Sequence, residues 1–172
     1  NVGMIELCKN QNSETLLDYY KKFGIGRYPT SIMLPSSEGY LPHKSQFTPR
    51  DKVSSCYGYG LTLSALQIAQ AYSVFANNGI FKDFKLLKNE DVSSRRVISE
   101  STASNILKAL EMVTKDGTGK AANVNGFSQG GKTGTVHQIR SGSGYAEDMY
   151  RASFIGITPV SYTHLTLPTR KL

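Results

Sequence analysis

The stretch GFSQGGKTGT, residues 126–135, places a lysine and two threonines among glycines. Residues of these types can bind an anion, either a phosphate or a carboxylate. The first eight residues match the pattern GxxxxGK[ST] of phosphate-binding loops, in which backbone amides cradle a nucleotide. The same lysine and threonine would bind a different ligand if the segment formed a strand at the wall of a groove. The two alternatives require different secondary structure, so the neighbouring residues discriminate between them.

A phosphate-binding loop must lead into a helix, because the helix N-terminus and the glycine amides together point at the phosphate. The residues that follow Thr133 are GTV, a composition with poor helix propensity and good strand propensity. No apolar strand precedes the segment, and no later apolar run ends in an aspartate that could hold magnesium. We therefore predict a strand and interpret the eight-residue match as accidental.

On a strand, Lys132 would place an ammonium group beside a ligand carboxylate, and the Thr133 hydroxyl could donate a second hydrogen bond to it. Gly134 would let the ligand lie directly against the backbone, because it has no side chain. His137 follows on the same strand and could act as a base, although a partly packed strand histidine is the more common case. The alternative for the whole segment is a polar edge strand without a ligand.

Three segments upstream have the periodicity of amphipathic helices, residues 13–24, 62–79 and 100–117, each ending near a glycine. Ser13 is the expected N-cap of the first. Residues 24–56 contain glycine, proline and serine at intervals and predict a long ordered loop. The predicted core positions are Leu16, Leu17, Tyr20 and Phe23 in the first helix, Ala65, Ile68, Ala69, Tyr72 and Phe75 in the second, and Ala103, Ile106, Leu107, Leu110 and Val113 in the third.

The hydrophobic period changes after Gly130. Residues 132–139 and 150–160 have strand composition, and residues 140–149 between them are turn-like, which predicts an antiparallel hairpin with a long tip. Helices that precede a hairpin, without βαβ alternation, favour an α+β fold.

Composition excludes several functional classes. The net charge of +7 comes from scattered basic residues that form no stripe, so we expect no nucleic-acid partner. No uninterrupted apolar run is long enough to cross a membrane. Cys8 and Cys56 have neither CxxC spacing nor paired histidines, so they indicate neither a zinc site nor a disulfide framework, and we interpret Cys8 as a small core residue.

Several longer segments, taken together, resemble the transpeptidase domain of class B penicillin-binding proteins, most closely the septal cell-division type. The resemblance covers roughly residues 1–161, in family order. It implies an α+β fold of the penicillin-binding transpeptidase or β-lactamase-like kind, an antiparallel sheet with packed helices that is incomplete in this chain. The segments are NVGMIELCK, LLDYYKKFGIG, SSCYGYGLTLSALQIAQAYSVFANNG, DGTGKAA, GGKTGTVHQ and YRASFIGITPV.

The resemblance implies three motifs around one pocket, SxxK, SxN and KTG. Asn1 would be the last residue of SxN, with its amide bonded to the nucleophile's lysine and to the substrate's peptide carbonyl. Lys132 would stabilise the proton network and the bound carboxylate, which Thr133 would also contact, and Gly134 would complete the substrate-binding wall. The backbone N–H of Thr135 would form the oxyanion hole together with the nucleophile's own N–H. No metal or cofactor is implied.

The reaction implied by the resemblance is serine acyl transfer, which cross-links peptidoglycan stem peptides during cell division and which β-lactam antibiotics intercept. The family's SxxK nucleophile and membrane anchor would precede Asn1, so we expect this chain to be an inactive C-terminal fragment. The parent protein would lie in the inner membrane facing the periplasm, with divisome proteins and a glycosyltransferase as partners. The alternatives are a P-loop nucleotide-binding protein and a non-catalytic penicillin-binding scaffold or sensor.

The last eleven residues, 162–172, read YTHLTLPTRKL and lack the alternation and the amphipathic period of the preceding segments. They resemble peptides translated from sequencing-adapter DNA. We therefore expect residues 1–161 to be the C-terminal part of the transpeptidase domain and the remainder to be an artefactual tail outside the family.

Overall fold

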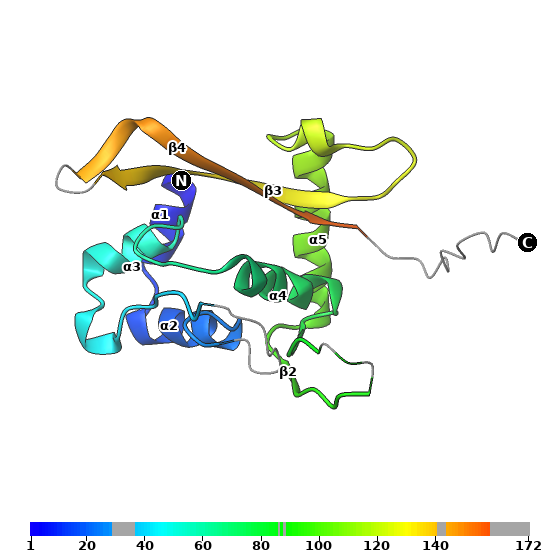
Figure 1. The fold of residues 1–172 in the computed structure, drawn as a ribbon, viewed down its shortest axis with the longest axis horizontal. Helices are drawn as coiled ribbons and strands as arrows, with labels where there is room; N and C mark the ends of the chain where they lie inside the picture. Colours follow the sequence, from blue (N-terminus) through cyan, green and yellow to red (C-terminus); the bar gives the residue numbers. More distant parts are fainter. Residues whose placement is uncertain (29–36, 86, 88, 141–143, 159–172) are drawn as a thin grey trace, which may run out of the picture. The chain divides into compact units, whose positions relative to one another are not determined.

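The computed structural model describes residues 1–28, 37–85, 87, 89–140 and 144–158 (Figure 1). The chain divides into two compact units, residues 1–106 and 107–172, and each is described by itself. The predicted boundary at residue 161 and the predicted tail 162–172 lie outside the described residues. Within the described ranges, no helix combines the length and the apolar character needed to cross a bilayer.

The first unit is mainly helical, and the second is built on a long hairpin (Figure 1). Helix α5, Glu100–Lys115, begins in the first unit and ends in the second. The other elements of the first unit are α1 Val2–Lys9, α2 Ser13–Lys22, the 3₁₀ turn Lys44–Gln46, α3 Pro49–Ser55, α4 Ala65–Ala76, and the antiparallel pair β1 Ile80–Lys82 and β2 Ser94–Arg96. The second unit contains the 3₁₀ turn Lys120–Ala122 and strands β3 Gly130–Arg140 and β4 Gly144–Ile157.

Helix α2 confirms the first predicted helix, with a cap one residue earlier than expected. Asn12, rather than Ser13, is the N-cap, and its side chain accepts a 2.8 Å hydrogen bond from the backbone N–H of Glu14. Gly24 stops the helix with φ at 82°, a backbone conformation that glycine adopts without a steric penalty. Leu17, a predicted core residue, is 3% exposed.

Helix α4 lies where it was predicted, but it buries a different face. Ala65 and Ala69, both expected in the core, are exposed. The side chains that are buried instead include Gln67 and Gln70, each 1% exposed, and Val74, which is fully buried. The predicted core face of α4 was therefore wrong at Ala65 and Ala69, whereas the other predicted residues, Ile68, Tyr72 and Phe75, are half-buried.

Hydrogen bonds to backbone carbonyls explain the burial of the two glutamines. The Gln67 amide nitrogen donates to the carbonyl oxygens of two loop residues, Arg27 at 3.0 Å and Glu38 at 2.8 Å. The Gln70 amide nitrogen donates to the carbonyl oxygen of Lys82, at the end of β1, at 3.0 Å. Partly buried backbone carbonyls need donors, and these amides supply them where an apolar side chain could not.

Helix α5 confirms part of its predicted face. Ala103 and Leu110 are buried at 1% and 8% exposure, whereas Ile106 is exposed. Thr114, which the pattern did not select, is 1% exposed because its hydroxyl donates a 2.7 Å hydrogen bond to the carbonyl oxygen of Gln129.

Helix α3 contradicts the prediction of a long loop over residues 24–56; part of that range, 29–36, lies outside the described residues. The helix starts with a capping box in which Thr48 and Asp51 bond each other's backbone N–H, and Pro49 occupies its first turn. Helix α1 was also not predicted. Both are short, so their hydrophobic periodicity is weak.

Cys8 and Cys56 form a disulfide, so the expectation that they indicate no such bond was wrong. The bond joins α1 to the C-terminal end of α3 across 48 residues of sequence, and the two Cα atoms lie 6.3 Å apart. Cys8 is also a core residue, as predicted, at 7% exposure. Two cysteines this far apart in sequence give no local signal of pairing, because pairing depends on the contact between α1 and α3.

Strands β3 and β4 confirm the predicted antiparallel hairpin and, with the helices, the α+β fold. Lys132 pairs with Ile155 in the register, and an irregularity falls between His137 and Ile139. Pairing resumes beyond this irregularity and continues to Arg140, so the long tip predicted over residues 140–149 was wrong.

Candidate functional site

Lys132, Thr133 and Gly134 lie within strand β3, opposite Ile155 and the next two residues toward the start of β4. The strand continues for six residues beyond Gly134, to Arg140, so no helix follows the lysine and threonine. A phosphate-binding loop requires that helix, and the structure therefore contradicts the phosphate-loop alternative. The predicted strand is confirmed.

The Lys132 side chain is exposed, and its ammonium donates a 2.8 Å hydrogen bond to the carbonyl oxygen of Thr133. Among the described residues, no carboxylate lies within ion-pair distance of this ammonium. This ammonium is available to an anionic ligand, and the bond to Thr133 holds it near the strand.

The Thr133 hydroxyl lies 2.8 Å from the hydroxyl of Thr118, in the turn that follows α5. That turn is fixed by backbone bonds, from the N–H of Gly117 to the carbonyl of Met112 and from the N–H of Gly119 to the carbonyl of Val113. The third helix therefore ends close to Gly117, as predicted. Sequence reasoning missed Thr118, because a threonine between two glycines gives no sign of which strand it will contact.

The backbone of β3 adds a second kind of donor. Successive strand residues direct their N–H and C=O groups to opposite sides, so Thr133 and Thr135 direct theirs to the same side. The carbonyl of Gly134, on the other side, accepts a 3.4 Å hydrogen bond from the Ser153 hydroxyl of β4. This arrangement indicates that Thr133 and Thr135 direct their backbone groups away from β4, toward an edge that pairs with no other strand in the described ranges.

Glycines at the start of β3 allow two close approaches. A Cβ at Gly130 would lie 3.0 Å from the backbone N–H nitrogen of Glu111, so this glycine lets α5 pack directly on the strand. A Cβ at Gly131 would lie 2.4 Å from the Phe154 ring and 2.7 Å from the carbonyl oxygen of Ile155. The two glycines before Lys132 therefore set the position of the strand against α5 and β4.

We expect Gly131→Ala to destabilise the hairpin by about 1–3 kcal/mol, because the Ile155 carbonyl is backbone and moves only if β4 shifts. Gly156→Ala is the matched control on the facing position, where a new Cβ would meet nothing nearer than the Phe154 ring at 3.4 Å. Thermal unfolding of the two variants checks this. Equal melting temperatures would show that Gly131 is not required for the register.

His137 packs its ring against Tyr150 on the paired strand, with the centroids 4.5 Å apart. The side chain is half-buried, which confirms the interpretation as a partly packed strand histidine. Cross-strand aromatic pairs of this kind stabilise hairpins. We therefore assign His137 to the structure of the hairpin.

Asn1 lies in the other compact unit, and its position is described within that unit alone. It is the N-cap of α1, where its carbonyl accepts a 3.0 Å bond from the N–H of Ile5. Its side chain is exposed and makes no capping hydrogen bond, so the amide can bind another group.

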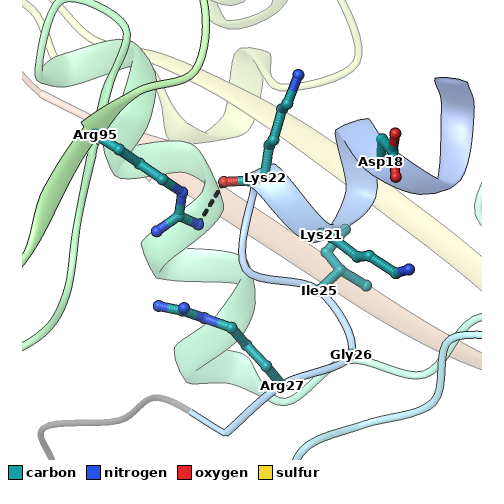
Figure 2. Close-up of a pocket in the computed structure, with 7 residues that line it drawn as sticks. All are labelled: Asp18, Lys21, Lys22, Ile25, Gly26, Arg27 and Arg95. Atoms are coloured by element: carbon teal, nitrogen blue, oxygen red, sulfur yellow. Dashed lines mark hydrogen bonds between the residues drawn. The ribbon is translucent and has the colours of Figure 1, made fainter.

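An open basic depression occurs in the first unit (Figure 2). Arg95 donates a 2.8 Å hydrogen bond to the carbonyl of Lys22, and its guanidinium lies 4.0 Å from the ring centre of Phe81. Burial, and next the charge of Arg27, lower the pKa of Arg95 from its ordinary value. Arg27 is ion-paired with Asp83. These contacts cover a buried aromatic ring, so we assign the two arginines a structural role.

Comparison with known proteins supports one family. The chain matches the family model of the penicillin-binding protein transpeptidase domain over residues 1–167. It is 34% identical over 161 residues to the probable peptidoglycan D,D-transpeptidase PenA of Neisseria gonorrhoeae, covering 92% of this chain and 28% of that protein. It is 29% identical over 170 residues to the peptidoglycan D,D-transpeptidase FtsI of Escherichia coli K12, covering 97% and 29%. The chain thus spans less than a third of these two relatives.

Solved structures are similar in fold. The transpeptidase domain of penicillin-binding protein 3 from Burkholderia pseudomallei aligns with a TM-score of 0.82 at 30% identity, covering 93% of this chain and 49% of that one. Penicillin-binding protein 3 from Mycobacterium tuberculosis, complexed with aztreonam, aligns with a TM-score of 0.81 at 29% identity, covering 91% and 39%. These alignments confirm the expected fold.

Proposed function

We propose that the whole protein is a peptidoglycan D,D-transpeptidase acting in cell division, because the chain belongs to the penicillin-binding protein transpeptidase family. The observation that supports this most is the placement of Lys132 and Thr133 on an extended strand, with an ammonium that no carboxylate of the described residues pairs and a hydroxyl beside it. Sequence similarity alone does not provide that geometry.

Each of the five site residues has a proposed role. Lys132 and Thr133 bind the terminal carboxylate of the stem peptide, and Gly134 lets the peptide lie against the strand. The N–H of Thr135 stabilises the oxyanion, because it faces the edge of β3 that no other strand of the described residues pairs. Asn1 hydrogen-bonds the substrate's peptide carbonyl and the lysine next to the nucleophile, with an amide that its own helix does not use.

The reaction has two acyl transfers. A serine oxygen attacks the D-alanyl-D-alanine carbonyl while its proton passes to a base, and the tetrahedral oxyanion forms beside the Thr135 N–H. Collapse breaks the peptide bond, and D-alanine leaves with a proton as its amine. The amine of a second stem peptide then attacks the acyl-serine ester, forms the cross-link and releases the serine. A β-lactam acylates the same serine by opening its ring.

The serine belongs to an SxxK motif that we place in the residues preceding Asn1, together with the membrane anchor of a periplasmic enzyme. Divisome proteins and a glycosyltransferase are the proposed partners. Without the nucleophile, residues 1–172 alone are expected to be inactive. The predicted domain boundary at residue 161 stays a prediction.

Labelling the longer protein with a fluorescent penicillin tests this proposal. One covalent label is expected per molecule, and it should disappear when the SxxK serine is replaced by alanine. Absence of label from the folded wild-type protein, or label that survives loss of the serine, would refute the assignment. A protein that is labelled but does not cross-link stem peptides would instead be a non-catalytic penicillin-binding scaffold.

A further inference from the structure

Helix α1, which Asn1 begins, is connected to the rest of its unit near its C-terminal end. Cys8, the next-to-last residue of the helix, is bonded to Cys56 at the end of α3, and α1 packs on α3 (Figure 1). Cys8 is the buried residue of this helix, whereas Val2 and Leu7 are 75% and 64% exposed. The disulfide therefore anchors the buried end of α1 within the described unit.

Lys52 of α3 provides a second attachment at the same end. Its ammonium donates hydrogen bonds to the carbonyl oxygens of Lys9, at 2.9 Å, and Gln11, at 3.0 Å. A cation at the C-terminus of a helix also interacts favourably with the helix dipole. The carbonyl oxygen of Lys52 lies 3.2 Å from the Cys56 sulfur, so the two attachments are adjacent.

Asn1 lies at the opposite end of α1 from these two attachments. Asn1 and Cys8 are seven residues apart, which corresponds to about 10 Å along the helix axis. A helix is rigid along its axis, so a small rotation at the Cys8 end displaces the Asn1 amide by a comparable or larger amount. The fixed position of the asparagine thus depends on the attachment at Cys8.

We propose that the Cys8–Cys56 disulfide positions the Asn1 amide for acyl transfer, by fixing the helix whose first turn Asn1 caps. The inference rests on the proposed function, which gives Asn1 its role at the substrate. Cys8 and Cys56 are positioning residues, since neither contacts the reacting atoms. Full activity would then require the oxidised form of this pair.

The test uses the longer protein with both cysteines replaced, Cys8→Ser together with Cys56→Ser. The rate constant for acylation by penicillin is expected to fall by about 10- to 100-fold, because misplacement of a positioned group by an ångström has effects of that size. The dissociation constant of the noncovalent penicillin complex should change little. In the Asn1→Ala background, the same pair of substitutions should cause no further loss, because the disulfide acts through Asn1.

Val74→Ala controls for general destabilisation. It removes methyl groups from a fully buried position in α4, away from α1, and should lower the melting temperature while the acylation rate constant of the folded protein stays at the wild-type value. If the serine pair does not fold, Lys52→Met replaces it, because this variant releases the Lys9 and Gln11 carbonyls and keeps the disulfide. It should show a smaller loss that likewise vanishes in the Asn1→Ala background.

The outcomes separate the two proposals. A folded, oxidised wild-type protein that takes no penicillin label would refute the proposed function itself. A labelled wild type, with a folded variant that acylates at the wild-type rate, would overturn only the positioning role. A loss of equal size with and without the Asn1 amide would overturn it as well, since the disulfide would then act elsewhere.

Discussion

Replacing Lys132 by alanine is expected to lower the rate constant of penicillin acylation in the longer protein by about 100- to 1,000-fold, the usual cost of removing one positioned charge-stabilising donor. The ammonium is exposed, and its hydrogen bond in the structure goes to the neighbouring Thr133 carbonyl. Loss of the side chain should therefore change the stability of the fold little and weaken the binding of a carboxylate strongly. Stopped-flow measurement of acylation, with the melting temperature recorded in parallel, checks both statements.

Lys108→Ala is the matched control for this prediction. Lys108 is an exposed lysine on α5, the helix that packs on β3, so its removal changes the net charge by the same amount. We expect its acylation rate to equal that of the wild type. Equal effects of the two substitutions would mean that overall charge, and not the position of Lys132 on the strand, governs the reaction.

Removal of the Cys8–Cys56 disulfide should lower the free energy of unfolding by about 4 kcal/mol. The bond closes a loop with a sequence separation of 48 residues, and the entropy of the unfolded chain that it removes corresponds to roughly that value. For a domain of this size, the melting temperature should fall by about 8–16 °C. Thermal unfolding of the Cys8→Ser, Cys56→Ser variant, compared with the oxidised wild type, measures it.

Reduction of the wild-type protein with dithiothreitol is the control. Reduced wild type and the serine variant should unfold at nearly the same temperature, because both lack the cross-link. If the reduced wild type had the same melting temperature as the oxidised protein, the disulfide would add no stability. A serine variant much less stable than the reduced protein would assign part of the effect to the packing of Cys8, which is 7% exposed.

The elements with strong periodicity could be predicted from the sequence. The hairpin of β3 and β4 followed from its β-branched composition, and α4 and α5 followed from their apolar spacing. The strand assignment of Lys132 followed from the residues after it, which are unsuited to the helix of a phosphate loop. The strand that carries Lys132 could therefore be predicted from the sequence alone, whereas the roles of its residues stay predictions.

Features that depend on tertiary contacts could not be predicted. Gln67 and Gln70 are buried because backbone carbonyls of two loop residues and of β1 need donors, and helical periodicity carries no information about those neighbours. The pairing of Cys8 with Cys56 depends in the same way on α1 meeting α3. At such positions tertiary contacts, and not local sequence propensity, determine which side chains are buried or paired.

A structure of the longer protein acylated by a penicillin would show whether Lys132 and Thr133 bind the ligand. We expect the ligand carboxylate within about 3 Å of the Lys132 ammonium and the Thr133 hydroxyl, and a hydrogen bond from the Thr135 N–H to the ester carbonyl oxygen. An acylated serine whose ligand carboxylate lies away from β3, with Lys132 still bonded only to the Thr133 carbonyl, would contradict this expectation.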